Sequence, residues 1–239
     1  MTGGSKGGRA KESRPAENWA LIEPFLSARG IRLEARQRRQ VVGFVELLLH
    51  WNRRINLVGD AERIYSRHVL DCLVLGSLPR PGGPCDVVDI GSGAGLPGLL
   101  MAILYPDWRV VSLERVAKKA TFQQVAASEL AIGNFQPLRR DVAEFAQSPD
   151  GREKFDLALA RAFAGLATVL QVGAGLLRPG GELWAMRGRK AAQEQSRVAR
   201  KILAPFQPEP VRHPYRWPEL DVGGEVLVYR RRAPRLTGA

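Results

Sequence analysis

The stretch from 85 to 98, CDVVDIGSGAGLPG, holds the residues best suited to chemistry in this chain. Its β-branched apolar run at 87–90 predicts a short, buried parallel strand. Three glycines, Gly91, Gly93 and Gly95, follow the strand at alternate positions. Glycine lets the backbone turn tightly and approach a ligand with no Cβ in the way. This spacing therefore predicts a loop that binds a nucleotide or a nucleoside.

The next segment, 96–104, predicts a helix, with Pro97 in the first turn where proline is tolerated. The loop fits two cofactor motifs, because 93–98 matches the dinucleotide pattern G-x-G-x-x-G and 91–95 matches the G-x-G-x-G of S-adenosylmethionine enzymes. Asp89 at the strand end favours the second motif. Its carboxylate would repel the pyrophosphate of NAD and attract the ammonium and sulfonium of S-adenosylmethionine.

Other candidate site residues follow the later strands. Glu114 ends the second strand about 20 residues past the glycines, the spacing at which an acid binds ribose hydroxyls; the alternative is a solvated surface glutamate. The backbone around Val142 and Ala143 would meet the adenine, with apolar contact from Leu96. Arg161 follows the fourth strand, where the transferable methyl group and the target base should meet, and a buried charge there favours function over a structural ion pair.

The elements that position these residues alternate between strand and helix from Cys85 onward, which is typical of a doubly wound parallel sheet. In such a sheet, ligands bind beyond the carboxyl ends of the strands. The pattern ends in a basic helix at 189–201 and two further strands. Strands are expected at 85–90, 109–113, 134–138, 155–160, 182–186 and 226–229, with one more before the last.

The N-terminal part predicts a basic disordered tail at 1–15 and a helical cap at 16–80, followed by a cofactor domain at 81–232. Asn18 is the expected N-cap of the first helix. In a third helix at about 61–78, His68 and Asp71 stand three residues apart on one face. They form either a catalytic pair or, as we favour, a direct contact that ties the helix to the domain.

The amino-acid composition indicates which kinds of partner and cellular location to expect. The 239 residues carry a formal net charge of +12 and a pI near 10.5, which indicates a polyanion, most simply nucleic acid; the alternative is a basic but inert surface. The chain has no apolar run of membrane-span length and no signal-peptide pattern, so we expect a cytoplasmic protein. Cys72 and Cys85 show no metal or redox spacing and suit small apolar core positions, and no metal site is expected.

Several motifs together resemble the bacterial small-subunit ribosomal RNA guanine-N7 methyltransferases, also called glucose-inhibited division protein B. The resemblance covers about 20–230 and rests on VDIGSGAGLPG, on LERVAKK at 113–119, on RAF at 161–163, on WNRRINL at 51–57 and on RHVLD at 67–71. It implies a seven-stranded methyltransferase sheet with an N-terminal helical cap, and 16S ribosomal RNA or the small subunit as partner of a monomeric enzyme. The S-adenosylmethionine contacts that it implies come from Gly91, Leu96, Glu114, Val142, Ala143 and Arg161.

The chain departs from the family pattern at three positions. Arg187 stands before Gly188 where lysine is usual, Cys72 replaces a common serine, and Asp141 stands where some members have arginine. The sequence assigns no role to Arg187.

Two catalytic motifs are absent from the sequence, which limits the methyl-transfer reactions that the chain could catalyse. The chain has neither the Asn/Asp-Pro-Pro-aromatic tetrad of exocyclic-amine methyltransferases nor a Pro-Cys nucleophile. Guanine N7 needs neither, because its lone pair is free and carries no proton. Two alternatives remain open: an NAD-dependent oxidoreductase and a non-catalytic ribosome-assembly factor.

Overall fold

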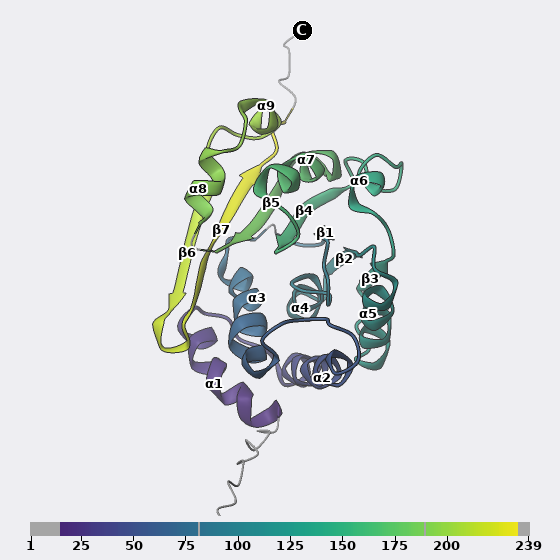
Figure 1. Ribbon diagram of the computed structural model, residues 1–239, viewed down its shortest axis with the longest axis vertical. Coiled ribbons are helices and arrows are strands. Elements are labelled where there is room, and N and C mark those ends of the chain that lie inside the picture. Colours follow the sequence, from purple (N-terminus) through teal and green to yellow (C-terminus); the bar gives the residue numbers. More distant parts are fainter. Residues whose placement is uncertain (1–14, 81, 189, 234–239) are drawn as a thin grey trace, which may run out of the picture.

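A seven-stranded sheet organises the part of the chain that the computed structural model describes, residues 15–80, 82–188 and 190–233 (Figure 1). Its order is β3-β2-β1-β4-β5-β7-β6. The first five strands are parallel, whereas β7 is antiparallel to both β5 and β6. The strands are β1 Cys85–Ile90, β2 Trp108–Leu113, β3 Phe135–Leu138, β4 Phe155–Arg161, β5 Leu177–Arg187, β6 Val211–Trp217 and β7 Val222–Arg230. The predicted fold class is confirmed, and the strand order reverses between β1 and β4, where ligands bind in such sheets.

Helices cover both faces of the sheet. Successive side chains along each strand point to opposite faces and so belong to two hydrophobic cores. Val87 of β1 belongs to the core on one face and Val88 to the core on the other. The first face carries α4 (Gly98–Leu104) and α5 (Ala117–Glu129) together with the N-terminal helices; the second carries α6 (Val142–Phe145), α7 (Leu166–Leu176), α8 (Ala191–Ser196) and α9 (Arg200–Leu203). Both faces of the parallel strands are therefore buried, which explains their nearly continuous apolar sequences.

Two predicted boundaries near the C-terminal half are wrong. The fifth strand, expected at 182–186, begins earlier, because β5 starts at Leu177 and its pairing with β4 shifts register after Phe155 to absorb the turn at Gly180, whose φ is +85°. The expected basic helix at 189–201 is two short helices, α8 and α9, separated where Ala199 adopts an extended backbone. Arg189 lies outside the described residues.

The N-terminal helices pack directly on the sheet. They are α1 (Pro15–Ala28), α2 (Ala35–Asn52) and a helical run of mixed type, comprising η1 (Ala61–Arg63), the π-helix η2 (Ile64–Leu70), α3 (Asp71–Leu73) and η3 (Val74–Ser77). Asn18 is not a cap, because α1 begins three residues earlier. The Gln37 side chain in α2 donates hydrogen bonds to the carbonyls of Ile103 (2.9 Å) and Leu104 (3.1 Å) at the end of α4. These helices share one core with the sheet, and the division into cap and domain stays a prediction.

Most of the predicted tail, 1–14, lies outside the described residues. Cys72 and Cys85 are buried free thiols, as expected of core positions. In the described part of the chain, no helix has both the length and the apolar character that crossing a membrane requires.

Candidate cofactor and substrate site

The glycine loop after β1 has the left-handed backbone that only glycine adopts freely. The φ angles are +63° at Gly91, +58° at Gly93 and +84° at Gly95. A Cβ added at Gly93 would meet nothing within 4 Å, so this glycine leaves open space. A Cβ at Gly91 would fall 2.0 Å from Cδ2 of Phe163. Only Gly93 therefore fits the prediction of a backbone kept bare for a ligand; at Gly91 an aromatic ring fills the space.

Glu114 holds the loop from the end of β2. Its Oε2 accepts a hydrogen bond from the Gly93 backbone N–H (3.0 Å), and its Oε1 accepts one from the N–H of Val116 (2.7 Å). The residue is only 7% exposed and lines the cavity described below. It is not the solvated surface glutamate of the alternative interpretation.

Gln123 is a support that sequence analysis missed. From α5, its Nε2 donates to the carbonyl of Gly93 (2.8 Å) and to Ser92 Oγ (2.9 Å), and its Oε1 accepts from Ser112 Oγ (2.7 Å). Gln123 is fully buried. A polar residue among the inward-facing apolar positions of the helix was the available signal, since a buried amide needs partners.

A cavity of about 480 Å³ opens beyond the carboxyl ends of β1, β2 and β4. This volume lies in the range of about 300–1,000 Å³ that is usual for small-molecule sites. Six of the predicted site residues line it: Gly91, Gly93, Leu96, Glu114, Val142 and Arg161. Gly95 and Ala143 do not; Gly95 faces Gln123, and Ala143 is exposed in the first turn of α6. A cavity of about 580 Å³ beside the β6–β7 hairpin contains no part of the glycine loop.

Asp141, which also lines the cavity, caps α6. Its Oδ1 accepts hydrogen bonds from the backbone N–H groups of Ala143 (2.9 Å) and Glu144 (3.3 Å). Aspartate is a preferred N-cap because it satisfies donors that the helix leaves free. The departure from the family pattern at 141 therefore has a local structural reason.

Asp89 lies beneath the loop rather than in the cavity. It is 0% exposed, and its Oδ2 accepts a hydrogen bond from the N–H of Gly98 (2.8 Å) at the start of α4. Burial raises the pKa of this carboxyl to about 7. The expectation that its charge faces the cofactor is wrong, because Asp89 lies inside β1, one residue before its end at Ile90, and its side chain is buried against the start of α4. The choice between cofactors therefore rests on other observations.

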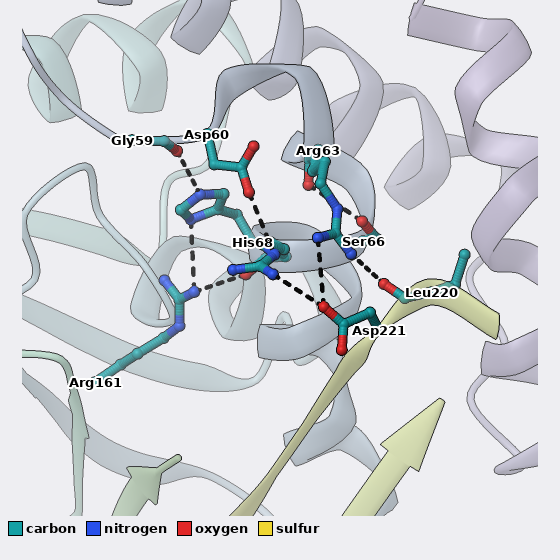
Figure 2. Close-up of polar contacts among 9 residues, drawn as sticks. Gly59, Asp60, Arg63, Ser66, His68, Arg161, Leu220 and Asp221 are labelled. Atoms are coloured by element: carbon teal, nitrogen blue, oxygen red, sulfur yellow. Dashed lines mark hydrogen bonds and ion pairs between the residues drawn. The ribbon is translucent and has the colours of Figure 1, made fainter. Parts of the chain in front are cut away.

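Arg161 lines the cavity from the end of β4, and the N-terminal helical run holds its guanidinium (Figure 2). Nε donates to Asp71 Oδ2 (3.0 Å), and Nη2 donates to the carbonyl of Arg67 (2.8 Å) and lies 3.5 Å from His68 Nδ1. The hydroxyl of Tyr215 donates to the other Asp71 oxygen (2.6 Å). A structural ion pair, the alternative weighed against function, is therefore present; a role toward ligands stays a prediction.

His68 and Asp71 do not bond to each other; both contact Arg161 instead. His68 Nε2 donates to the carbonyl of Gly59 (2.9 Å), which leaves Nδ1 as the acceptor facing Arg161. Burial, followed by the nearby Arg161 cation, lowers the pKa of His68. The favoured interpretation, a direct contact between the two, is wrong, because the helical run is tied to β4 through Arg161 instead. A catalytic role for His68 and Asp71 stays a prediction.

Comparison with known proteins shows the family of this chain. Residues 37–209 match the family model described as rRNA small subunit methyltransferase G. The chain belongs to this family. It is 36% identical over 182 residues to the proteins named ribosomal RNA small subunit methyltransferase G from Burkholderia thailandensis and Burkholderia pseudomallei, an overlap of 75% of this chain and 79% and 78% of theirs. The predicted family and the predicted S-adenosylmethionine-dependent methyltransferase activity are confirmed, and neither alternative function is favoured.

Solved structures agree on the fold. A predicted O-methyltransferase from Agrobacterium tumefaciens superposes with a TM-score of 0.55 at 19% identity, covering 69% of this chain and 82% of that one. TrmN from Thermus thermophilus gives 0.51 at 22% identity, covering 68% and 48%. At these identities the likeness concerns the architecture alone.

The methyltransferase site fits its cofactor on its own geometry. Gly93 leaves open space beside a cavity of suitable volume, and Glu114 presents a buried carboxylate at the end of β2, the position predicted to bind ribose hydroxyls. Arg161 adds a cation opposite the loop, which suits the methionyl carboxylate.

Arg187, whose role could not be assigned from sequence, anchors the segment after Arg161. Its Nη1 donates to the carbonyl of Ala164 (2.8 Å), and the side chain also pairs with Glu194 (3.6 Å). Arg187 is 9% exposed at the end of β5. It therefore fixes the short connection from β4 to α7 at the edge of the cavity.

Proposed function

We propose that this protein transfers the methyl group of S-adenosylmethionine to N7 of a guanine in 16S ribosomal RNA of the small subunit. The observation that carries the guanine N7 assignment is the state of the acid–base groups that line the cavity. Among the described residues, its imidazole and carboxyl groups are those of His68, Glu114 and Asp141, and each already accepts or donates a hydrogen bond within the protein. Such a site suits an atom that loses no proton.

The residues of the site would act by positioning the cofactor and the guanine. S-adenosylmethionine supplies an electrophilic methyl group bonded to a sulfonium. Gly93 and Glu114 would hold the ribose end, Leu96 and Val142 the adenine, and Arg161 the methionyl carboxylate. Orientation of two reactants can by itself lower a barrier by about 7–11 kcal/mol. Catalysis at N7 therefore needs no general base from this chain.

The rim of the cavity suits an RNA substrate. Arg115 and Arg140 are exposed there, and Lys119 is half-buried beside them. Together with the net charge of +12, these cations favour a polyanionic partner. We place the enzyme in the cytoplasm, where ribosomal RNA is found, and propose that it acts as a monomer, with 16–80 as a helical cap on a methyltransferase domain at 81–232. Light scattering during gel filtration tests the oligomeric state.

Mapping of 7-methylguanosine in 16S ribosomal RNA tests the reaction. RNA from cells with and without this gene should differ at one guanine, and the wild-type gene should restore the mark. An unchanged methylation map would reject the proposal. If deletion changed subunit assembly while every methyl group stayed, the non-catalytic assembly factor would be the better interpretation.

A further inference from the structure

Phe163 stands out at the mouth of the cavity because it is a large apolar side chain left in solvent. It is 37% exposed and lines the cavity two residues after Arg161. The described residues contain two other exposed large apolar side chains, Leu21 at 56% and Val211 at 59%, and neither lines this cavity. Exposed aromatic area beside a ligand site calls for a partner, because burying it is favourable.

The ring is held in place by the glycine loop. A Cβ at Gly91 would lie 2.0 Å from Cδ2 of Phe163 and 2.7 Å from Cε2 and Cγ, so the ring occupies the space next to that backbone. One side of the ring is thus supported, while more than a third of the residue stays open. An aromatic ring that is supported on one side and open elsewhere is suited to stacking.

The backbone before the ring is strained. Ala162 has φ of +52°, in the left-handed region that costs a residue with a Cβ of order 1–3 kcal/mol. Such strain persists only where the surroundings enforce it. Here they do, because Arg161 is bonded to Asp71 on one side of the segment and Arg187 bonds the Ala164 carbonyl on the other.

We propose that Phe163 is the platform on which the target guanine stacks, an inference that rests on the proposed function. Enzymes that modify a base take it out of its stack, and RNA-binding proteins commonly receive unstacked bases on aromatic side chains. Stacking holds the face of the guanine and leaves its edge, which includes N7, free to point toward the methyl group. The apolar ring therefore does for the base what Arg161 and Glu114 do for the cofactor.

Methyl transfer kinetics test this with four variants. The substrate is the small ribosomal subunit from cells without this gene, at saturating S-adenosylmethionine. Phe163→Ala should lower kcat/KM about 5- to 150-fold, the usual range for loss of one base–aromatic stack. Phe163→Leu, which keeps apolar bulk without a π face, should lose nearly as much. Phe163→Tyr, which keeps the ring, should stay within about threefold of wild type, and the control Leu21→Ala should match wild type.

Calorimetric affinity for S-adenosylmethionine and the thermal midpoint complete the test. The S-adenosylmethionine affinity should stay near that of wild type in all four variants, because the ring is assigned to the base. The thermal midpoint reports separately how much stability is lost when the ring no longer packs on Gly91. If Phe163→Leu turns over like wild type, or if cofactor affinity falls in parallel with kcat/KM, the stacking role is overturned. A wild-type enzyme that transfers no methyl group to subunits would overturn the proposed function itself.

Discussion

Asp71 Oδ2 accepts a hydrogen bond from Arg161 Nε at 3.0 Å, which joins the N-terminal helical run to the end of β4. The two side chains are 17% and 18% exposed. The second Asp71 oxygen is occupied by the hydroxyl of Tyr215 in β6. Two nitrogens of the guanidinium, Nε and Nη2, are thus committed to protein partners. Asp71 and Tyr215 therefore orient the cation that the cavity receives.

Replacing Asp71 should weaken the site through Arg161. In Asp71→Asn, one carboxylate oxygen becomes an NH2 group that cannot accept from Arg161 or Tyr215. We expect S-adenosylmethionine affinity to fall by about 1–2 kcal/mol, below the usual range for a bond to a charged group because the pair is partly exposed. Tyr215→Phe, which removes only the second bond, should cost less. Wild-type affinity and rate in Asp71→Asn, with lower stability, would leave the pair a purely structural role.

Arg161 itself distinguishes two ligand roles. If it binds the methionyl carboxylate, as we favour, Arg161→Ala loses cofactor affinity and methylation rate together. If it contacts guanine O6, affinity stays near normal while the rate falls. Arg161→Lys should resemble the alanine variant, because a point charge cannot reproduce a planar fork that is bonded on two sides. Calorimetry and single-turnover rates measured on the same preparations separate these outcomes.

Gly93→Val should abolish cofactor binding and leave the chain folded. A Cβ there meets no protein atom, so the new side chain would occupy the open space of the cavity. Its φ of +58° also makes a β-branched residue cost roughly 1–3 kcal/mol of stability. Gly30→Val is the matched control, since Gly30 has φ of +71°, has equally free surroundings and does not line the cavity. Equal calorimetric affinity in the two variants would remove Gly93 from the site.

Glu114→Ala should weaken S-adenosylmethionine binding by about 1–3 kcal/mol, the usual cost of polar partners left unpaired. The variant also frees the N–H groups of Gly93 and Val116, so unfolding by denaturant should be measured alongside affinity. Glu144→Ala, an exposed carboxylate in α6 that does not line the cavity, controls for loss of charge alone. A loss of stability without a loss of affinity would assign Glu114 to the loop only.

Local sequence patterns predicted the sheet and most of the cavity. The strand–glycine–helix run and the periodicity of the later strands depend on neighbours in the chain, so β1 to β5 and the positions of Gly93, Glu114 and Arg161 follow from sequence. The inward turn of Asp89 and the partners of Arg161 do not. Asp71 and Arg161 are 90 residues apart, and only the packing of the helical run on the sheet brings them together. Phe163 was missed as a site residue for the same reason, whereas Gln123 is detectable as a polar residue among the inward-facing apolar positions of its helix.

Ribosomal RNA affinity should fall steeply with salt, because exposed cap arginines such as Arg36, Arg39 and Arg54 would displace phosphate counterions. Replacing one of them by glutamine should reduce the slope of log K against log salt by about 1. Arg109→Gln, at the start of β2 and so at the opposite end of the sheet from the cavity, is the control. Binding of 16S RNA between about 50 and 200 mM salt provides the measurement. A flat response would show that the charge excess is not the docking surface.

Asp89 should make stability fall as pH rises toward neutrality. Its folded pKa of about 7 lies above the ordinary value of 3.8, so the folded protein holds a proton that the unfolded chain releases. The stability from this group is therefore complete below about pH 4 and is lost as pH rises through about 7, at up to about 1.4 kcal/mol per pH unit. Asp89→Asn stays neutral and lacks this loss. Its free energy of unfolding relative to wild type should therefore increase from pH 5 to 7 and then level off.

Asp86→Asn is the control, because hydrogen bonding to Arg109 lowers the pKa of Asp86. The difference in the free energy of unfolding between this variant and wild type should be constant from pH 5 to 7. If the free energies of unfolding of wild type and Asp89→Asn instead changed in parallel with pH, Asp89 would be ionised in the folded protein over the whole range from pH 5 to 7.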